Sequence, residues 1–550
     1  MIKFRIQPCW LLLVAVAWLQ PAIVSGQDAA PSPLAPLLVA LPAADYATRQ
    51  QLVRDISLTH APQARAVLSA FIAGRLYQRS ADGAIFIAAA DVAGGADAAG
   101  LALTDPLSGR AAGRSDATGL EVIGTNNQLR KALRQALALF DLEDRDRAVR
   151  LAAVHEISGA LDDETAATLK RRLPLEPDSR VSEEIRQALA LHDLASPEAK
   201  LRLSGVHALT GSLNPDVYNQ LTELTNAPAG SAEAEQVRAA ARAALRSIDS
   251  RRRLYSGIET LFFGLSLGSV LVLSAIGLSI TFGVMGVINM AHGELMMLGA
   301  YATYVVQQWM PGHVGTSIVV SIPVAFVVAG LAGVAIERGV VRFLYGRPLE
   351  TLLATFGVSL VLQQAVRDIF TANNRPIVTP DWLAGSLQIN EVLSITYVRF
   401  YVVLFTLAVF ALLQLVLRFT RLGLEVRAVS QNRPMARAMG IRTQWVDAMT
   451  FGLGSGIAGV AGVALSQLTN VGPNLGQSYI VDSFMVVVFG GVGNLWGTLV
   501  SGLSLGVVNK LVEPFAGAVL AKILVLVFLI LFIQRRPRGL FPQKGRAAEN

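Results

Sequence analysis

The sequence is almost free of cysteine. Its 550 residues contain a single one, Cys9, in an N-terminal apolar run that follows Lys3 and Arg5. A basic start, an apolar run and the small residues around Ser25 are typical of a secretory signal peptide, which we predict over residues 1–26. An uncleaved anchor is the alternative. If the segment is cleaved, the rest of the chain has no disulfide and no thiol chemistry.

Motifs for catalysis are also missing. The sequence has no G-x-x-x-x-G-K-[ST] phosphate-binding loop, no H-E-x-x-H motif and no cysteine–histidine pair with metal-ligand spacing. We therefore expect no enzymatic activity, no cofactor and no metal. The formal net charge of +7 does not predict nucleic-acid binding, because many of the arginines lie in short loops between apolar segments, as the positive-inside rule requires.

Charge and hydrophobicity divide the chain in two. Residues before about 253 are rich in Ala, Asp, Glu and Arg, whereas most of the rest consists of long apolar runs. We predict an all-α protein: a polytopic bundle of membrane helices preceded by a mainly helical extramembrane domain with a small β-hairpin region. The predicted parts are a lead-in with helices and short strands (27–127), a helical-repeat domain (128–253), a membrane domain (254–536) and a tail (537–550).

An internal repeat characterises the extramembrane half. The segment RQALALFDL from Arg134 returns as RQALALHDL from Arg186, and RLAAVHEISGAL from Arg150 returns as RLSGVHALTGSL from Arg202; both offsets are 52 residues. Each unit holds about three helical segments, so we predict a short HEAT- or armadillo-like stack. Its role stays open between a protein-binding face and a spacer.

Two smaller patterns belong to the same half. The histidines His155 and His207 occupy equivalent repeat positions, and without other ligands nearby we interpret them as packing residues of the repeat rather than metal ligands. The segment 77–88 reads as two short strands around an Asp82-Gly83 turn.

The membrane half contains nine apolar segments, and a helical span needs roughly 20 residues. The seventh segment is short and the eighth ends on Lys510 and Glu513, so we expect eight or nine crossings, some by broken helices. The segments are 257–283, 292–309, 316–336, 351–370, 398–418, 447–470, 480–492, 495–513 and 517–534.

The arginine distribution predicts the topology. Arginines cluster in the connection 337–350, in the loop 421–442 and after residue 534, which places these three regions in the cytoplasm. The run Arg251–Arg253 before the first span would, by charge alone, keep the preceding domain inside. Because long domains led by a signal sequence translocate largely regardless of charge, we predict that this domain is outside the membrane, in the periplasm.

One stretch, Gly277 to Tyr301, interrupts an apolar run with glycine and polar residues. We expect helix breaks at Gly283, Gly286 and Gly293, with Asn289, His292 and Glu294 inside the break. Polar groups at membrane depth are tolerated only where protein or a water-filled cavity covers them. We therefore predict that the three polar residues line or gate a solute pathway; the alternative is that they cap and join two helix ends. Two further candidates for the pathway are Asp482 and Asn494.

The loop from Gly423 to Val446 is predicted to form two short amphipathic helices separated near Asn432-Arg433-Pro434. It presents Ala and Met between arginines at a cytoplasmic surface, which suits insertion into a partner protein; an ordinary charged loop is the alternative. The residues that we assign to this contact are Glu425, Arg427, Ala428, Arg433, Ala436, Met439 and Gly440.

Four motifs together carry a resemblance to a known family. They are GVMGVINMAHGELMMLGAY, the loop 423–446 with FGLGSGIAGVAGV behind it, VVVFGGVGNLWGTLVSG, and the ending RRPRGLF. Over about residues 257–542 the chain resembles the LivH-type permeases of branched-chain amino acid ABC importers. A signal peptide and a helical-repeat domain ahead of such a permease resemble the permease of urea importers.

The resemblance implies partners and a mechanism. It implies a second, LivM-like permease subunit, two ATP-binding subunits and a periplasmic solute-binding protein, in a bacterial inner membrane that this chain crosses several times. Loop 423–446 would then couple ATP hydrolysis by the partners to alternating access. Urea is the solute we predict, and branched-chain amino acids are the alternative. A passive channel and a membrane-anchored scaffold are the rival functions.

Overall fold

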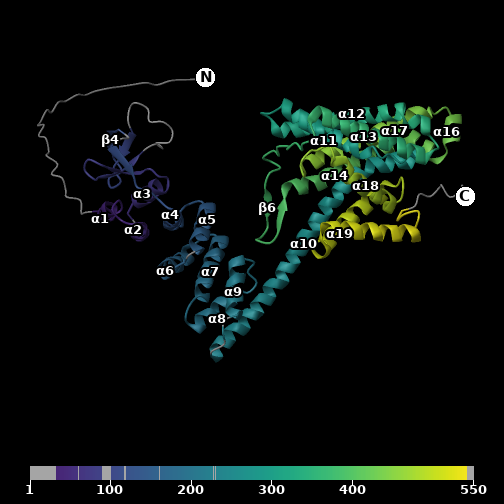
Figure 1. Ribbon diagram of the computed structural model, residues 1–550. Helices are drawn as coiled ribbons and strands as arrows, with labels where there is room; N and C mark the ends of the chain where they lie inside the picture. Colours follow the sequence, from purple (N-terminus) through teal and green to yellow (C-terminus); the bar gives the residue numbers. More distant parts are fainter. Residues whose placement is uncertain are drawn as a thin grey trace, which may run out of the picture. The chain divides into compact units, whose positions relative to one another are not determined.

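The computed structural model (Figure 1) describes residues 32–59, 61–88, 101–116, 119–159, 161–226, 228 and 231–541. The predicted signal peptide and residues 542–550 of the predicted tail lie outside this range. The described residues form two compact units. One contains residues up to Leu209 together with Glu223–Ala241, and the other contains Thr210–Thr222 together with Arg242 and the residues that follow.

The first unit starts with helices packed beside a five-stranded antiparallel sheet of order β4-β3-β2-β1-β5. The predicted hairpin is present as β1–β2, with Tyr77 opposite Phe86, but three more strands join it. The all-α class was therefore too narrow. Strands β3 to β5 have only three to five residues each, too few for a period-2 pattern to stand out. The elements are α1 (Leu34–Ala40), α2 (Tyr46–Leu58), α3 (Ala64–Ile72), β1 (Leu76–Arg79), β2 (Ile85–Ala88), β3 (Leu101–Thr104), β4 (Ala111–Ser115) and β5 (Leu120–Val122).

Six helices follow in two sets of three, and each helix of the second set begins 52 residues after its counterpart. They are α4 (Asn127–Asp141), α5 (Arg147–Ser158), α6 (Asp163–Arg172), α7 (Ser179–Leu194), α8 (Ala199–Ala208) and α9 (Pro215–Asn226), with the short turn η3 (Leu173–Leu175) between the sets.

Equivalent side chains make equivalent contacts in the two sets. Arg150 donates hydrogen bonds to the carbonyls of Asp144 and Arg145, and Arg202, 52 residues later, donates to those of Ser196 and Pro197. The assignment to the HEAT or armadillo class stays a prediction.

The histidine interpretation was wrong. His155 and His207 both lie on the exposed side of their helices, so they do not pack the repeat. No cluster of potential metal ligands occurs among the described residues. The 3.6-residue period alone did not distinguish the buried face from its edge at these positions.

The next helix, α10 (Ala232–Met285), is continuous over 54 residues and carries the first predicted span. Two arginines of the Arg251–Arg253 run hold its extramembrane part: Arg251 donates to the Gly211 carbonyl and Arg252 to the Leu213 carbonyl. The Arg252 guanidinium also lies 4.3 Å from the ring centre of Tyr218. These charges therefore have a local structural role.

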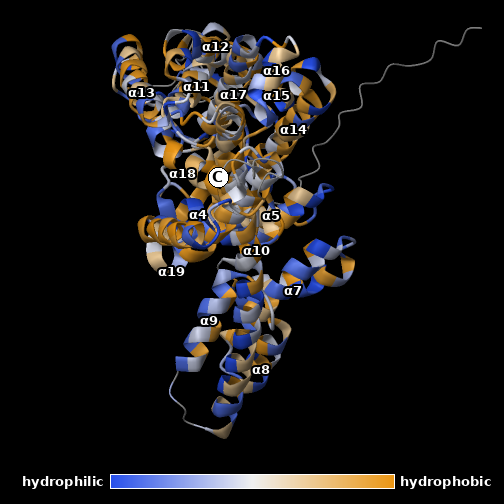
Figure 2. Cartoon of the chain, turned by 90° about the vertical axis from the view of Figure 1, so that its right-hand side faces the viewer, coloured by the Kyte–Doolittle hydropathy of each residue, from blue (hydrophilic) through white to orange (hydrophobic). Residues whose placement is uncertain are grey.

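The membrane unit continues with helices and one further hairpin. They are α11 (His292–Trp309), α12 (Val314–Gly339), η4 (Val341–Leu344), α13 (Pro348–Phe370), β6 (Ser386–Gln388), β7 (Ser394–Thr396), α14 (Tyr397–Phe419), α15 (Arg421–Gln431), α16 (Arg433–Ala438), α17 (Thr443–Ser466), α18 (Leu475–Gly490) and α19 (Leu495–Arg535). Figure 2 shows α19 mainly in the colour of hydrophobic residues, whereas α7 to α9 alternate between both colours.

Six of the described helices are long and apolar enough to cross a membrane: α10, α12, α13, α14, α17 and α19. The predicted number of eight or nine is not confirmed. Polar residues at both ends of α11 lower its hydropathy, and α18 has only 16 residues. The predicted eighth and ninth segments both lie in α19, which is interrupted at Gly517 with φ 78°.

Close backbone contacts at glycine hold the membrane helices together. The sequence GLSLG occurs in α10 (264–268) and again in α19 (502–506), and the two copies cross: a Cβ on Gly268 would lie 2.7 Å from the Leu503 Cα. Helix α17 is the most enclosed of the six apolar helices and contacts both α11 and α12. A Cβ on Gly299 of α11 would lie 2.0 Å from the Gly459 carbonyl oxygen of α17.

Candidate functional site

The joint between α10 and α11 is a short irregular segment, 286–291, inside the membrane unit. Gly286 ends α10 with φ 68°, a conformation that other residues adopt only with strain. Of the three predicted breaks, only this one occurs. Gly283 and Gly293 lie inside helices, where their missing side chains admit the backbones of Gly493 and Gly476.

Backbone polar groups of the joint are satisfied by its own side chains and by α13. The Asn289 Oδ1 accepts from the Ala291 N–H at 3.0 Å, and the Thr355 Oγ1 of α13 accepts from the Met290 N–H at 3.1 Å. Asn289 is fully buried. The joint is therefore covered by protein, as irregular backbone at membrane depth requires.

His292 and Glu294 begin α11 and are both buried. The His292 Nε2–H donates to the Ser274 carbonyl of α10 at 2.9 Å, so this ring ties the two helix ends together. The Glu294 Oε1 accepts from the Ser359 hydroxyl of α13 at 3.1 Å. The Glu294 Oε2 and the His292 Nδ1 have no hydrogen-bond partner among the described residues.

The other two predicted pathway residues make their contacts elsewhere. Asp482 of α18 pairs with Lys522 of α19 at 2.9 Å. Asn494 caps α19 by accepting from the Gly497 N–H, and its amide donates to the Phe541 carbonyl. The ending RRPRGLF thus folds back onto the α18–α19 junction, where the Leu540 N–H also donates to the Phe489 carbonyl at 2.9 Å.

Sequence reasoning missed the polar residues of α13 that contact the joint and Glu294. Thr351, Thr355, Ser359 and Gln363 are all buried and recur every fourth residue, which places them on one helical face. Arg367 continues the series and donates to the Gln363 Oε1 and to the Asn474 Oδ1. This spacing is visible in the sequence, and a search for polar rather than apolar periodicity would have found it.

The two short helices predicted in loop 423–446 are present as α15 and α16. Asn432 separates the two helices and caps α16 by accepting from the Met435 N–H at 3.0 Å. Gly440, with φ 86°, ends α16 while the Ile441 N–H donates to the Ala436 carbonyl, the hydrogen bond of a Schellman motif.

Arg433 anchors this loop to the rest of the unit. Its guanidinium donates two hydrogen bonds to the buried carboxylate of Asp447 on α17. The same guanidinium lies 4.0 Å from the ring centre of Tyr345. Burial alone would lower the pKa of Arg433, but the hydrogen bonds to Asp447 raise it above its usual value. A hollow of about 470 Å³ beside it is lined by Met285, Glu337, Arg342, Tyr345, Arg437 and Gln444, among others.

The seven residues assigned to the partner contact differ in exposure. Arg427, Met439 and Gly440 are exposed, Glu425, Ala428 and Arg433 are half-buried, and Ala436 is buried. Two apolar side chains that were not predicted, Leu424 and Met435, are more than half exposed, as is Met439. Contiguous exposed apolar side chains are typical of protein-binding surfaces, and these three lie on one short helical loop.

The fold and these two regions define a class: a polytopic helical membrane protein with a buried polar joint and a helical loop that presents apolar side chains. The comparisons assign the family. The chain belongs to the family described as branched-chain amino acid transport system / permease component, whose model matches residues 260–533. Members of this family are membrane permeases of ABC importers.

Named relatives agree with this assignment. The high-affinity branched-chain amino acid transport system permease protein LivH of Salmonella typhimurium is 31% identical over 294 residues, which are 52% of this chain and 94% of that protein. BraD of Pseudomonas aeruginosa is 29% identical over 52% of this chain and 96% of its own. The ribose import permease protein RbsC of Escherichia coli is 26% identical over 46% and 77%. No solved structure matches.

Proposed function

We propose that this chain is the permease subunit of a binding-protein-dependent ABC importer and that its solute is a branched-chain amino acid. The observation that carries the importer proposal is the loop α15–α16. It is fixed to the bundle by Arg433 and Asp447, yet it exposes Leu424, Met435 and Met439. A rigid element with an apolar surface can transmit the motion of a docked ATPase to α17.

The proposal includes partners that the family implies: a second permease subunit, two ATP-binding subunits and a solute-binding protein. In the bundle, we propose that the solute passes near the α10–α11 joint. Asn289, His292 and Glu294 are buried polar groups there, and ionisable residues inside membrane segments generally mark substrate or ion pathways. Asp482 and Asn494 are weaker candidates, because both have local partners.

Branched-chain amino acids are the favoured solute because the relatives that match almost over their whole length are named for transporting them. Urea is the second candidate, and a specific observation supports it. About half of this chain has no counterpart in those relatives, and an added domain ahead of the permease is the feature that we associate with urea importers. In both cases we propose that this domain is periplasmic, after a cleaved signal peptide.

The test is uptake into vesicles that contain this chain and its partner subunits, supplied with the binding protein and ATP. Labelled leucine and labelled urea are compared side by side. Uptake of leucine with exclusion of urea is the expected result. Uptake of urea alone would support the importer proposal but make urea the solute. Uptake of neither solute would contradict both solute proposals.

A further inference from the structure

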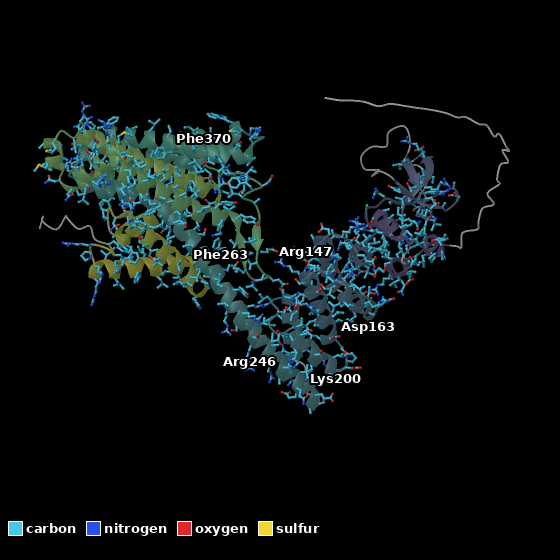
Figure 3. The ribbon with its side chains drawn as sticks, turned by 180° about the vertical axis from the view of Figure 1, so that it is seen from behind. Arg147, Asp163, Lys200, Arg246, Phe263 and Phe370 are labelled. Atoms are coloured by element: carbon cyan, nitrogen blue, oxygen red, sulfur yellow. The ribbon has the colours of Figure 1, made fainter. Side chains whose placement is uncertain are left out.

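Helices α11 and α13 lie side by side and run in the same direction. Three contacts along their length show this register: Met290 with Thr355, Glu294 with Ser359, and Tyr301 with Phe370, whose ring centres are 4.7 Å apart. Phe370, at the end of α13, is labelled in Figure 3. We name the contact that contains Glu294, Tyr301, Ser359 and Gln363 the α11–α13 seam.

Three polar atoms in the seam have no hydrogen-bond partner among the described residues: the Glu294 Oε2, the Gln363 Nε2 and the Tyr301 hydroxyl. The exposed fractions of these side chains are only 1%, 5% and 2%. The register places Gln363, one turn after Ser359, between the levels of Glu294 and Tyr301. Buried polar groups are normally satisfied, so three in one seam need an explanation.

Neighbouring side chains set the orientation of the first two groups. Ser359 donates to the Glu294 Oε1, so the other carboxylate oxygen remains as an acceptor. Arg367 donates to the Gln363 Oε1 at 3.3 Å, and it is itself held by the Asn474 Oδ1 at 2.9 Å. Since the amide oxygen is engaged, the Gln363 NH₂ group remains as a donor. The seam thus presents an acceptor on α11, the Glu294 Oε2, and a donor on α13, the Gln363 Nε2, one helical turn beyond Ser359.

We propose that the α11–α13 seam recognises the polar head group of the transported solute. A solute N–H group donates to the Glu294 Oε2, and a solute carbonyl or carboxylate oxygen accepts from the Gln363 Nε2. α-Amino acids and urea share this chemistry. Only 28% of the apolar stretch of α13 is buried against the rest of the chain. A movement of this single helix would therefore open the seam. This inference rests on the proposed function and assigns its recognition site.

The test uses the reconstituted transporter with Gln363→Leu and a matched control, Gln364→Leu, the adjacent residue on the exposed face of α13. We expect Gln363→Leu to reduce ATP-driven uptake at least tenfold with complex assembly retained, and Gln364→Leu to stay within twofold of the unmodified chain. A smaller change in the seam, Ser359→Ala, should raise KM for the solute more than it changes kcat.

A Glu294→Gln variant separates the two solute sources. An ammonium group bonds more strongly to a carboxylate than to an amide, because the hydrogen bond is charge-assisted. Glu294→Gln should therefore strongly reduce leucine uptake; if urea were instead the transported solute, the same variant should change its uptake much less. Equal uptake by the Gln363→Leu and Gln364→Leu chains would overturn this inference alone. A loss of complex assembly in the Gln363→Leu and Ser359→Ala variants would also overturn it, because these residues would then serve packing. Absence of ATP-driven uptake by the unmodified chain would overturn the proposed function as well.

Discussion

At the residue scale, Arg433 of α16 connects the loop 423–446 to Asp447 of α17, and its replacement should lower the stability of the chain. Arg433→Ala leaves the buried Asp447 carboxylate without its partner, and breaking a buried pair from one side typically costs about 3–5 kcal/mol. We expect a clearly lower thermal unfolding midpoint of the chain in detergent. The matched control is Arg347→Ala, which removes the exposed pair with Glu350 and should cost about 1 kcal/mol or less. Similar midpoints for the two variants would contradict the anchoring role.

The same scale shows what the sequence could and could not reveal about the site. Asn289, His292 and Glu294 were predictable, because polar residues inside an apolar run stand out against the cost of burying them. Their partners were not predictable. A serine on an apolar helix, such as Ser359, is unremarkable until the fold brings its hydroxyl to a carboxylate, and the Ser274 carbonyl that binds His292 is a backbone group that any residue would supply. Asn494 was a candidate from the sequence, but its bond to the Phe541 carbonyl depends on a fold-back that no local pattern encodes.

At the scale of elements, the end of α16 depends on one backbone conformation. Gly440 has φ 86°, and no atom lies within 4 Å of the position that a Cβ would occupy there, so a substitution acts through strain and not through a clash. Valine in a left-handed conformation is strongly disfavoured. We expect Gly440→Val to abolish ATP-driven uptake while binding-protein docking is retained.

Gly339→Val is the control for this variant, because Gly339 also has open space around it and no left-handed φ. Its uptake should equal that of the unmodified chain. Normal uptake by the Gly440→Val chain would remove the assignment of 423–446 as the coupling loop.

A second prediction for elements concerns the contact of α11 with α17. A methyl group at Gly299 would lie 2.0 Å from the Gly459 carbonyl oxygen, so Gly299→Ala must push the two helices apart. Overpacking of this kind costs about 1–3 kcal/mol, and we expect a lower unfolding midpoint. Gly357→Ala on α13, where nothing lies within 4 Å, should be neutral or slightly stabilising. A neutral Gly299→Ala would show that α11 and α17 are packed less closely.

Most elements were predictable and most of their joints were not. Long apolar runs predicted where the helices lie; α11 has the predicted bounds 292–309, although it is not among the six helices apolar enough to cross a membrane. The number of membrane spans was harder to predict. The length of an apolar run does not distinguish a crossing from a short buried helix such as α18, nor two spans from one helix interrupted at Gly517, such as α19. The repeat was predictable since similar sequences make similar helices, and the five-stranded sheet was not, since its outer strands are short.

At the scale of the whole molecule, the chain combines a family permease with a domain that its named relatives lack. The membrane half is the part that the family model matches, over residues 260–533. The other half contains the repeated helices α4 to α9, whose equivalent arginines make equivalent contacts. A passive channel would need no coupling loop, so the proposed role of loop 423–446 separates it from an importer. A scaffold would need a single anchor, whereas six of the described helices are long and apolar enough to cross a membrane.

The most direct test of the account is the energy dependence of solute uptake. Vesicles containing this chain, its partner permease and both ATPase subunits are loaded with ATP or with a non-hydrolysable analogue, and uptake of labelled leucine and urea is followed with and without the binding protein. The account predicts uptake only when hydrolysable ATP and binding protein are both present. Solute flux that is the same with and without hydrolysable ATP would contradict it and identify a passive channel.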